Sequence, residues 1–370
     1  MKILHYGLSS NSGGIETYLL KVANNINKDD FELSFLDMTS EGVAYKDSFE
    51  DLGMKIHKIT PRTDSFLKNR RELNKLFKTN KFDILHFHAN TLSYISPISI
   101  ALKYGCKVIL HSRSSNAPDS LVTKLLHNVN FKFLDHNNIK KIAVSKEAGE
   151  WLFRNEEFKI LNNGIEIEKF KFNLDDRNQY RSRININENF LVGHVGAFTY
   201  AKNHKQIIKI FYEFKKNNEK SKLLLIGDGD KKKEIIQDIK KLNLEKDVII
   251  IKNTSQIGSY MSAMDAMIFP SHYEGYPNVV LEAQTNGLPI IVSNNITKEV
   301  IVSPRYYISN INNTEEWIVN LEKIKQDNIN FSLRYDMEKT MRSLKKDVTA
   351  EIIKIENLYR SLFSEAIKER

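Results

Sequence analysis

The chain has 370 residues, of which 41% are hydrophobic and 27% charged, which is typical of a globular protein with two domains. No apolar run reaches the ~20 residues of a membrane span, and MKILHYGLSS resembles a first strand more than a secretory signal. A single cysteine, Cys106, excludes an intramolecular disulfide and indicates a reducing cytoplasm. The formal charge of +9 suits an anionic membrane or a polyanionic substrate, and no nucleic-acid-binding motif accompanies it.

Short apolar segments alternate with helical patterns along the whole chain. In the first half we expect strands at Lys2–Gly7, Phe31–Met38, Lys55–Ile59, Phe82–His88, Lys107–Ser112, Lys141–Ser145 and Lys159–Leu161. In the second half we expect them at Phe190–Val195, Lys222–Ile226, Val248–Ile251, Ala266–Pro270, Pro289–Ser293 and Arg305–Ile308. Strands that alternate with helices predict right-handed crossovers and parallel sheets.

The strand series restarts near Phe190, after the polar stretch Lys169–Asn189. We therefore predict an α/β protein with two doubly wound Rossmann-like domains that face each other across a cleft. The first spans residues 1–168 and is completed by the helix at about 350–370, and the second spans 169–349.

Two glycines, Gly13 and Gly14, follow the first expected strand, and a helical pattern begins near Ile15. Glycines at this place let a ligand approach the backbone closely, with a helix N-terminus behind them. A simple tight turn explains the same residues equally well.

The segment Ser65–Lys81 predicts a basic amphipathic helix. Its apolar stripe would contain Phe66, Leu73, Leu76 and Phe77, and cations occupy much of the remaining surface. We favour a surface helix whose stripe enters the domain core. The alternative, a cationic face that rests on anionic lipid, is compatible with it.

Several histidines and acids superficially suggest metal ligands. His86 and His88 end one expected strand and His111 ends another, but no further ligands stand at metal-site spacing. We therefore interpret the first two as structural residues or pocket wall. Asp228–Asp230 lies between a strand and a helix, where aspartate and glycine are expected in a turn. No metal is predicted.

The segment Ala266–Asn294 predicts a strand, a loop, a helix, a turn and a final strand. Pro277 suits the first turn of the helix, and Gly287 with Pro289 supplies its stop signal. The amides of Asn278, Val279 and Val280 are expected to be free and to form an anion site.

Two carboxylates frame this helix start, Glu274 in the loop and Glu282 about one turn inside the helix. A phosphate repels carboxylates, whose natural partners are hydroxyl donors. Amides for phosphate and acids for hydroxyls together predict a pocket for a nucleotide sugar.

Glu274, the seven residues that follow and Glu282 form the string EGYPNVVLE, which resembles the signature of the retaining family 4 glycosyltransferases. GGIE at Gly13, LHSRSSN around His111 and GHVGAFTYAKNH from Gly193 resemble further segments of that family. The resemblance covers nearly the whole chain, and it is strongest to bacterial exopolysaccharide and capsular enzymes. It implies the two-domain fold called GT-B.

The resemblance also implies roles for individual residues. Glu274 would hold the donor sugar, Glu282 the ribose, and Lys202 the leaving diphosphate. His111 would lie near the transferred sugar. Further donor contacts would come from Gly13, Gly14, Gly196, Gly275, Tyr276, Pro277, Asn278 and Val279.

Two positions depart from the family pattern. Ala197 stands where the family commonly has arginine, and Arg113 replaces a second histidine. Either another cation (Arg113, Lys205 or a neighbour) compensates for the missing arginine, or donor use is weakened.

The expected activity is a retaining, metal-independent transfer of a hexose-type sugar from a UDP-sugar to a saccharide or lipid-linked saccharide. No cofactor, metal or nucleic acid is expected. We expect a cytoplasmic protein. Peripheral contact with the inner face of the cell membrane stays open. A non-catalytic GT-B subunit and a GT-B sugar-nucleotide epimerase stay open as alternatives. Donor sugar, acceptor, linkage and oligomeric state are not indicated by the sequence.

Overall fold

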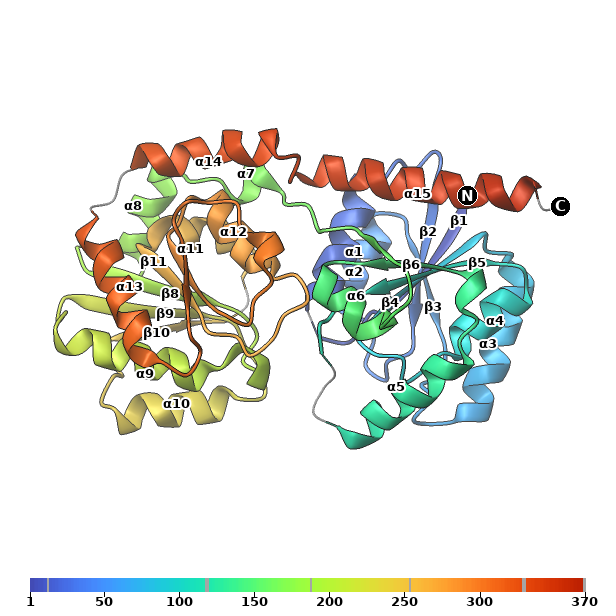
Figure 1. The fold of residues 1–370 in the computed structure, drawn as a ribbon, viewed down its shortest axis with the longest axis horizontal. Helices are drawn as coiled ribbons and strands as arrows, with labels where there is room; N and C mark the ends of the chain where they lie inside the picture. Colours follow the sequence, from blue (N-terminus) through green and yellow to red (C-terminus); the bar gives the residue numbers. More distant parts are fainter. Residues whose placement is uncertain (12, 117–119, 187, 253, 328–330, 369–370) are drawn as a thin grey trace. The chain divides into compact units, whose positions relative to one another are not determined.

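The computed structural model describes residues 1–11, 13–116, 120–186, 188–252, 254–327 and 331–368 (Figure 1). The chain forms two compact units, which are described separately below. The N-terminal unit contains Met1–Gly164 and Val348–Arg370, and the C-terminal unit contains Ile165–Asp347. The boundaries expected from the sequence, 168/169 and 349/350, lie close to these divisions.

The N-terminal unit is built on a seven-stranded sheet with the order β3-β2-β1-β4-β5-β6-β7, in which all pairs are parallel. Its strands are β1 Lys2–Tyr6, β2 Glu32–Asp37, β3 Lys55–Lys58, β4 Ile84–Ala89, β5 Lys107–Ser112, β6 Ile139–Ala143 and β7 Lys159–Ile160. All seven predicted segments are present. β6 begins earlier than predicted because Ile139 is buried and pairs with Val108.

Helices cover both faces of this sheet. They are α1 Gly14–Asn25, α2 Lys46–Asp51, α3 Phe66–Asn80, α4 Ser96–Lys103, α5 Leu121–Phe133, α6 Lys146–Phe153 and α15 Val348–Lys368, with a 3-10 turn at His136–Asn138. From α15, Ile352, Ile355, Tyr359 and Leu362 pack into one core with residues of α1 and β2. None of the described helices has the length and apolar character needed to cross a bilayer.

The helix α3 begins after Ser65, whose side chain accepts a hydrogen bond from the Lys68 amide. Leu73, Leu76 and Phe77 are buried, as predicted, but Phe66 is 50% exposed, so its place in the buried stripe was wrong. The first turn is anchored by a polar residue instead, because Asn69 is buried and donates to the Thr60 carbonyl.

The C-terminal unit has a six-stranded parallel sheet with the order β10-β9-β8-β11-β12-β13. Its strands are β8 Phe190–Val195, β9 Ser221–Ile226, β10 Val248–Ile251, β11 Ala266–Phe269, β12 Ile290–Ser293 and β13 Tyr306–Ser309. Its helices are α7 Ile167–Phe170, α8 Leu174–Arg183, α9 His204–Lys216, α10 Lys232–Lys241, α11 Ile257–Ala263, α12 Asn278–Thr285, α13 Thr314–Gln326 and α14 Phe331–Ser343, with 3-10 turns at Tyr200–Lys202 and Lys298–Val300.

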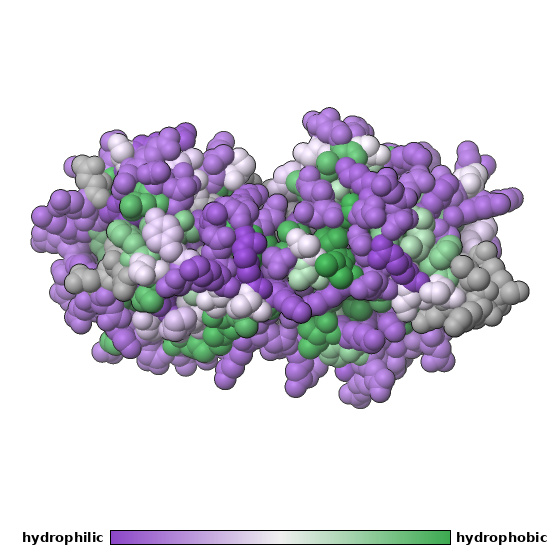
Figure 2. Space-filling model, turned by 90° about the horizontal axis from the view of Figure 1, so that it is seen from above, coloured by the Kyte–Doolittle hydropathy of each residue, from purple (hydrophilic) through white to green (hydrophobic). Residues whose placement is uncertain are grey.

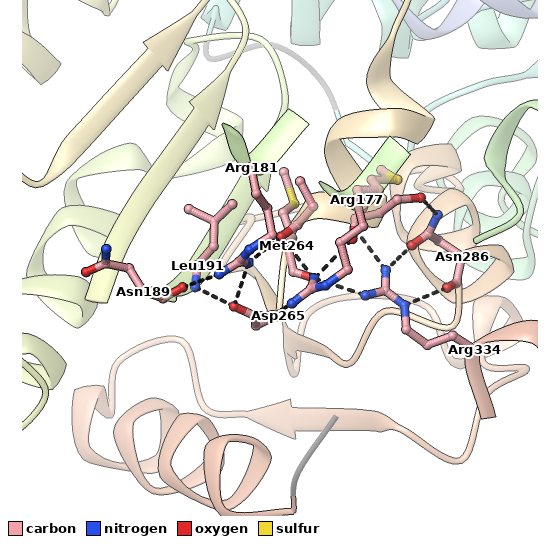
Figure 3. A network of polar contacts seen from close by, with 11 residues as sticks. Arg177, Arg181, Asn189, Leu191, Met264, Asp265, Asn286 and Arg334 are labelled. Atoms are coloured by element: carbon pink, nitrogen blue, oxygen red, sulfur yellow. Dashed lines mark hydrogen bonds and ion pairs between the residues drawn. The ribbon is translucent and has the colours of Figure 1, made fainter. Parts of the chain in front are cut away.

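A cluster of buried arginines lies where β8 and β11 begin (Figure 3). Asp265 precedes β11 and pairs with Arg177 at 2.5 Å and with Arg181 at 3.1 Å, both from α8. Arg334 from α14 is 1% exposed and donates to the carbonyls of Met261, Met264 and Asn286. These bonds fasten α8 and α14 to the sheet at the end opposite to the carboxyl ends of its strands.

The surface is mostly hydrophilic on the face shown in Figure 2, where apolar residues form small separate groups. This distribution agrees with the charged fraction of 27% and with the buried position of the large apolar side chains.

Candidate functional site

The sheet order of the C-terminal unit places a topological switch point between β8 and β11. After β8 the chain continues to β9 on one side, whereas β11 leads to β12 on the other. In open parallel sheets, ligands bind beyond the carboxyl ends of the strands at such a point. The segments that follow β8 and β11 contain Lys202 and Glu274, the two residues with the most specific predicted roles.

The side chains of Lys202 and Glu274 meet at this point. The Lys202 Nζ lies 2.6 Å from the Glu274 Oε1, and the two side chains are 17% and 16% exposed. Nζ also lies 4.6 Å from the centre of the Phe269 ring. The structure thus brings together two residues for which the sequence predicts one common site, and it joins them in an ion pair that the sequence did not indicate.

The two loops that carry this pair are joined by further bonds. The His272 amide donates to the Ala201 carbonyl at 2.8 Å, and Asn203 donates to the Pro270 carbonyl at 3.2 Å. The His272 ring stacks on Tyr200 with centroids 4.6 Å apart. The position of the lysine relative to the carboxylate is thus fixed by neighbouring backbone.

Glycines on the β8 side make room for this arrangement. A side-chain carbon at Gly196 would lie 3.2 Å from the Lys202 Cδ. Gly227 has a φ of +154°, and a side-chain carbon there would lie 2.1 Å from the Gly196 carbonyl oxygen. The Asp228–Asp230 segment is a turn, as predicted, and its Asp228 carbonyl accepts from the Phe198 amide at 2.9 Å. It supports the loop that contains Gly196.

The helix α12 begins at Asn278, after Pro277 in the N-cap position, with no side-chain cap. The predicted first-turn position of Pro277 is therefore off by one residue. Val280 was expected to have a free amide, but it donates to the Pro277 carbonyl at 3.0 Å because the first turn is tightened. The predicted anion site is thereby restricted to the amides before Val280.

The predicted contacts Gly275, Tyr276 and Pro277 are largely buried, whereas Asn278, Val279 and Glu282 are partly accessible. Lys346, which no motif marks in the sequence, lies beside the same loop with its Nζ 3.4 Å from the Tyr276 hydroxyl. Ala197, in contrast, is exposed. The ammonium of Lys346 therefore approaches the site from a segment that is 70 residues away from Tyr276 in the sequence.

An acid in the first turn of α1, directly after the glycine loop of the N-terminal unit, has a structural role. Gly13 is the N-cap of α1, Gly14 its first residue, and Ser12 lies outside the described residues. Glu16 is 4% exposed, and its Oε1 accepts from the Ser9 amide and the Ser9 hydroxyl, both at 2.8 Å. Glu16 was not among the predicted site residues, although the GGIE string contains it.

His111 belongs to a buried cluster of four histidines. Its Nδ1 lies 3.1 Å from the His86 Nε2, and its Nε2 lies 3.3 Å from the Arg113 guanidinium. The Arg113 guanidinium stacks over the Tyr18 ring at 3.8 Å. Both ring nitrogens of His111 thus have partners, so contact with a substrate would require Arg113 to move.

Three of the histidines, His5, His86 and His88, have ring nitrogens within 4.8 Å of one another. The His86 and His88 rings are stacked, with centroids 4.2 Å apart and planes 25° apart. Because the lone pairs lie in the ring planes, nitrogens of stacked rings do not converge as tetrahedral zinc ligands do. We therefore interpret the cluster as a packed core, in line with the structural role favoured for His86 and His88.

Comparison with known proteins agrees with this geometry. Residues 12–169 match the profile described as Glycosyltransferase Family 4, and residues 176–344 match the one described as Glycosyl transferases group 1. The chain therefore consists of a Glycosyltransferase Family 4 domain followed by a Glycosyl transferases group 1 domain. The matches cover both units, so the resemblance predicted from the sequence is confirmed.

This glycosyltransferase is similar to bacterial relatives and to solved structures. It is 27% identical to a putative glycosyltransferase, EpsF of Bacillus subtilis, over 81% of this chain and 80% of the relative. It is 25% identical to the Escherichia coli UDP-Gal:alpha-D-GlcNAc-diphosphoundecaprenol alpha-1,3-galactosyltransferase, over 71% of each chain. Anabaena HepE, solved in complex with UDP, superimposes with a TM-score of 0.82 at 19% identity, over 98% of this chain and 100% of that one. The predicted GT-B fold is confirmed.

The buried histidines make the stability of the glycosyltransferase sensitive to acid. Burial lowers the pKa of His5 to about 3 and of His204 to about 4, and it lowers the pKa of His111 well below the usual value. In the unfolded chain each titrates near 6.5. The unfolded state therefore takes up protons first, and each histidine should lower the unfolding free energy by up to about 1.4 kcal/mol per pH unit below that value.

We accordingly expect the urea midpoint to fall steadily from pH 7 to pH 5. His5→Gln, which cannot take up a proton, should make the decline less steep. A midpoint that stays constant over this range would contradict the assignment of these histidines as neutral core residues.

Proposed function

We propose that this glycosyltransferase is a retaining, metal-independent hexosyltransferase with a UDP-sugar donor and a lipid-linked saccharide acceptor, in bacterial exopolysaccharide or capsule synthesis. The observation that carries the proposal is the contact of Lys202 with Glu274 beside the start of α12. The Escherichia coli relative, named for a UDP-galactose donor and a diphosphoundecaprenol acceptor, and HepE with its bound UDP support the substrate class.

In the proposed donor complex, the diphosphate lies between Lys202 and the first amides of α12. Phosphate oxygens compete with Glu274 for the ammonium, and the displaced carboxylate accepts a hydrogen bond from a sugar hydroxyl. Breaking the bond between the sugar and the phosphate builds negative charge on the leaving diphosphate. A fixed cation already at that place lowers the barrier.

The acceptor hydroxyl then attacks on the face that the diphosphate leaves, and a diphosphate oxygen takes its proton. The anomeric configuration is retained without a protein nucleophile. Gly13, Gly14 and Gly196 are proposed as further donor contacts, and His111 as a group near the transferred sugar. Lys346, close to Tyr276, is the candidate that compensates for Ala197.

The proposal is tested by incubating the protein with a panel of nucleotide sugars and measuring release of the nucleoside diphosphate, with and without lipid-linked saccharides. We expect a UDP-sugar to be used, with faster release when acceptor is present and retained configuration in the product. Release of free sugar independent of acceptor would instead indicate an epimerase. Turnover that depends on a partner protein and is insensitive to Glu274 substitution would indicate a non-catalytic subunit.

Glu282→Ala should mainly weaken donor binding. Loss of one hydrogen bond between a carboxylate and a ribose hydroxyl should raise the donor KM by about 10-fold, with kcat nearly unchanged. Steady-state kinetics with varied donor measures both values. Glu245→Ala, an exposed acid in the same unit, is the matched control. A large fall in kcat at constant KM would contradict the ribose-binding role.

A further inference from the structure

The helix α5 exposes its apolar side chains. Leu121 is 86% exposed, Phe133 77%, Val122 67% and Leu125 63%, and Val129 and Leu126 are exposed by 41% and 39%. At roughly 100° per residue, all six lie within an arc of about 140° on one side of the helix. They form an apolar face, called the α5 face below, on a helix that lies along the bottom of the N-terminal unit in Figure 1.

The opposite side of α5, which packs on the unit, combines Phe131, which packs against the core, with buried polar side chains. His127 is 2% exposed, its Nδ1 accepts from the Leu92 amide at 3.1 Å, and its ring stacks on Trp151 with centroids 4.7 Å apart. Asn130 donates to the Leu92 carbonyl at 2.6 Å. A surface helix of a globular protein normally has the reverse arrangement, with its apolar stripe in the core. The hydrogen bonds of His127 and Asn130 hold α5 in this orientation, so its apolar face points outward in a well-packed helix.

Cations accompany the α5 face. Lys132 lies at its edge and Lys124 on its flank, and the helix carries no acidic side chain. Arg154 at the end of α6 contacts Asn128 and lies 4.4 Å from the centre of the Phe131 ring. Long basic side chains beside an apolar stripe are typical of helices that lie in a membrane interface, where the cations reach the lipid phosphates.

We propose that α5 docks the protein on an anionic bilayer, with the α5 face among the acyl chains and Lys124, Lys132 and Arg154 at the headgroups. The choice of a membrane rests on the proposed function, since a lipid-linked acceptor lies at a bilayer surface. It is also favoured by charge, because two copies joined through α5 would bring their lysines together. The sequence had suggested the helix at 65–81 for this contact, but the apolar residues Leu73, Leu76 and Phe77 of α3 are buried in the core.

The test is flotation of the full chain with vesicles of phosphatidylcholine alone and of phosphatidylcholine mixed with phosphatidylglycerol. The variant replaces Leu121, Leu125 and Phe133 by serine, three exposed side chains whose loss leaves the core intact. The matched control replaces Val319 and Leu333 by serine, which are exposed on α13 and α14 of the other unit. We expect the native chain and the control to float with the anionic vesicles, and the triple variant to bind them at least about 10-fold more weakly.

Donor turnover with a water-soluble acceptor should be the same in all three proteins, since α5 contains none of the proposed donor contacts. Equal flotation of the triple variant, or no binding by the native chain, would overturn the proposal. So would a native dimer in solution that the triple substitution converts to monomers while vesicle binding is unaffected. Binding that persists in a protein without any donor turnover would refute the proposed function and leave the docking surface standing.

Discussion

Glu274→Ala should lower turnover of the donor by roughly 100- to 1,000-fold, the typical loss when one preorganised electrostatic contact to a transition state is removed. The carboxylate lies 2.6 Å from Lys202, so its loss has two consequences. The donor sugar loses a hydrogen-bond acceptor, and Lys202 loses the partner that holds its ammonium in place. Both effects reduce kcat more than they raise KM.

Glu274→Gln separates these consequences, because the amide still offers an oxygen to a hydroxyl but no longer neutralises Lys202. We expect its turnover to lie between those of the native enzyme and the alanine variant. Glu245→Ala serves again as the control for removal of an exposed acid. The initial rate of nucleoside diphosphate release is measured for the native enzyme and for the three variants, Glu274→Ala, Glu274→Gln and Glu245→Ala. An alanine variant with native turnover would remove Glu274 from the site.

Asp265→Ala should destabilise the C-terminal unit by about 3–5 kcal/mol, because a buried ion pair that loses one partner leaves an uncompensated charge. Asp265 is 4% exposed and is the acid that pairs with both Arg177 and Arg181. Its Oδ2 also accepts from the Leu191 amide at 2.8 Å, at the start of β8. The backbone carbonyls around the arginines cannot replace a full negative charge.

The control for this substitution is Asp238→Ala, which removes a partly exposed partner of Lys241 at 3.4 Å. Pairs of that kind contribute at most about 1 kcal/mol. Trp317 is buried in the core of this unit, so urea unfolding followed by tryptophan fluorescence reports on it once Trp151 of the N-terminal unit is replaced by phenylalanine in all the proteins compared. Equal midpoints for Asp265→Ala and Asp238→Ala would contradict the structural importance of the arginine cluster.

The strands were the most predictable part of the fold. Lys107–Ser112, Phe190–Val195 and Val248–Ile251 have the predicted bounds, because each is a short apolar run in a parallel sheet with helices on both sides. The site was predictable where a local string carries it, as in the loop and helix that contain Glu274 and Glu282. The role of each of these residues stays a prediction.

The remaining features depend on contacts that sequence spacing does not reveal. The partner of Lys202 stands 72 residues further along the chain, and Lys346 belongs to no motif. Arg177 and Arg334 look like ordinary surface residues in the sequence, yet they are buried because carbonyls and one carboxylate surround them. For an amphipathic helix such as α5, the pattern gives the apolar face but not the direction in which it points.

The most direct test of the central claim is calorimetric titration of UDP into the native protein, Lys202→Ala and the control Lys209→Ala. Lys209 is exposed on α9, in the same unit and with the same charge. If Lys202 binds the diphosphate, its replacement should weaken UDP binding by at least about 10-fold, the value of one charged hydrogen bond, and Lys209→Ala should bind as tightly as the native protein. Equal UDP affinity of all three proteins would contradict the account of the site.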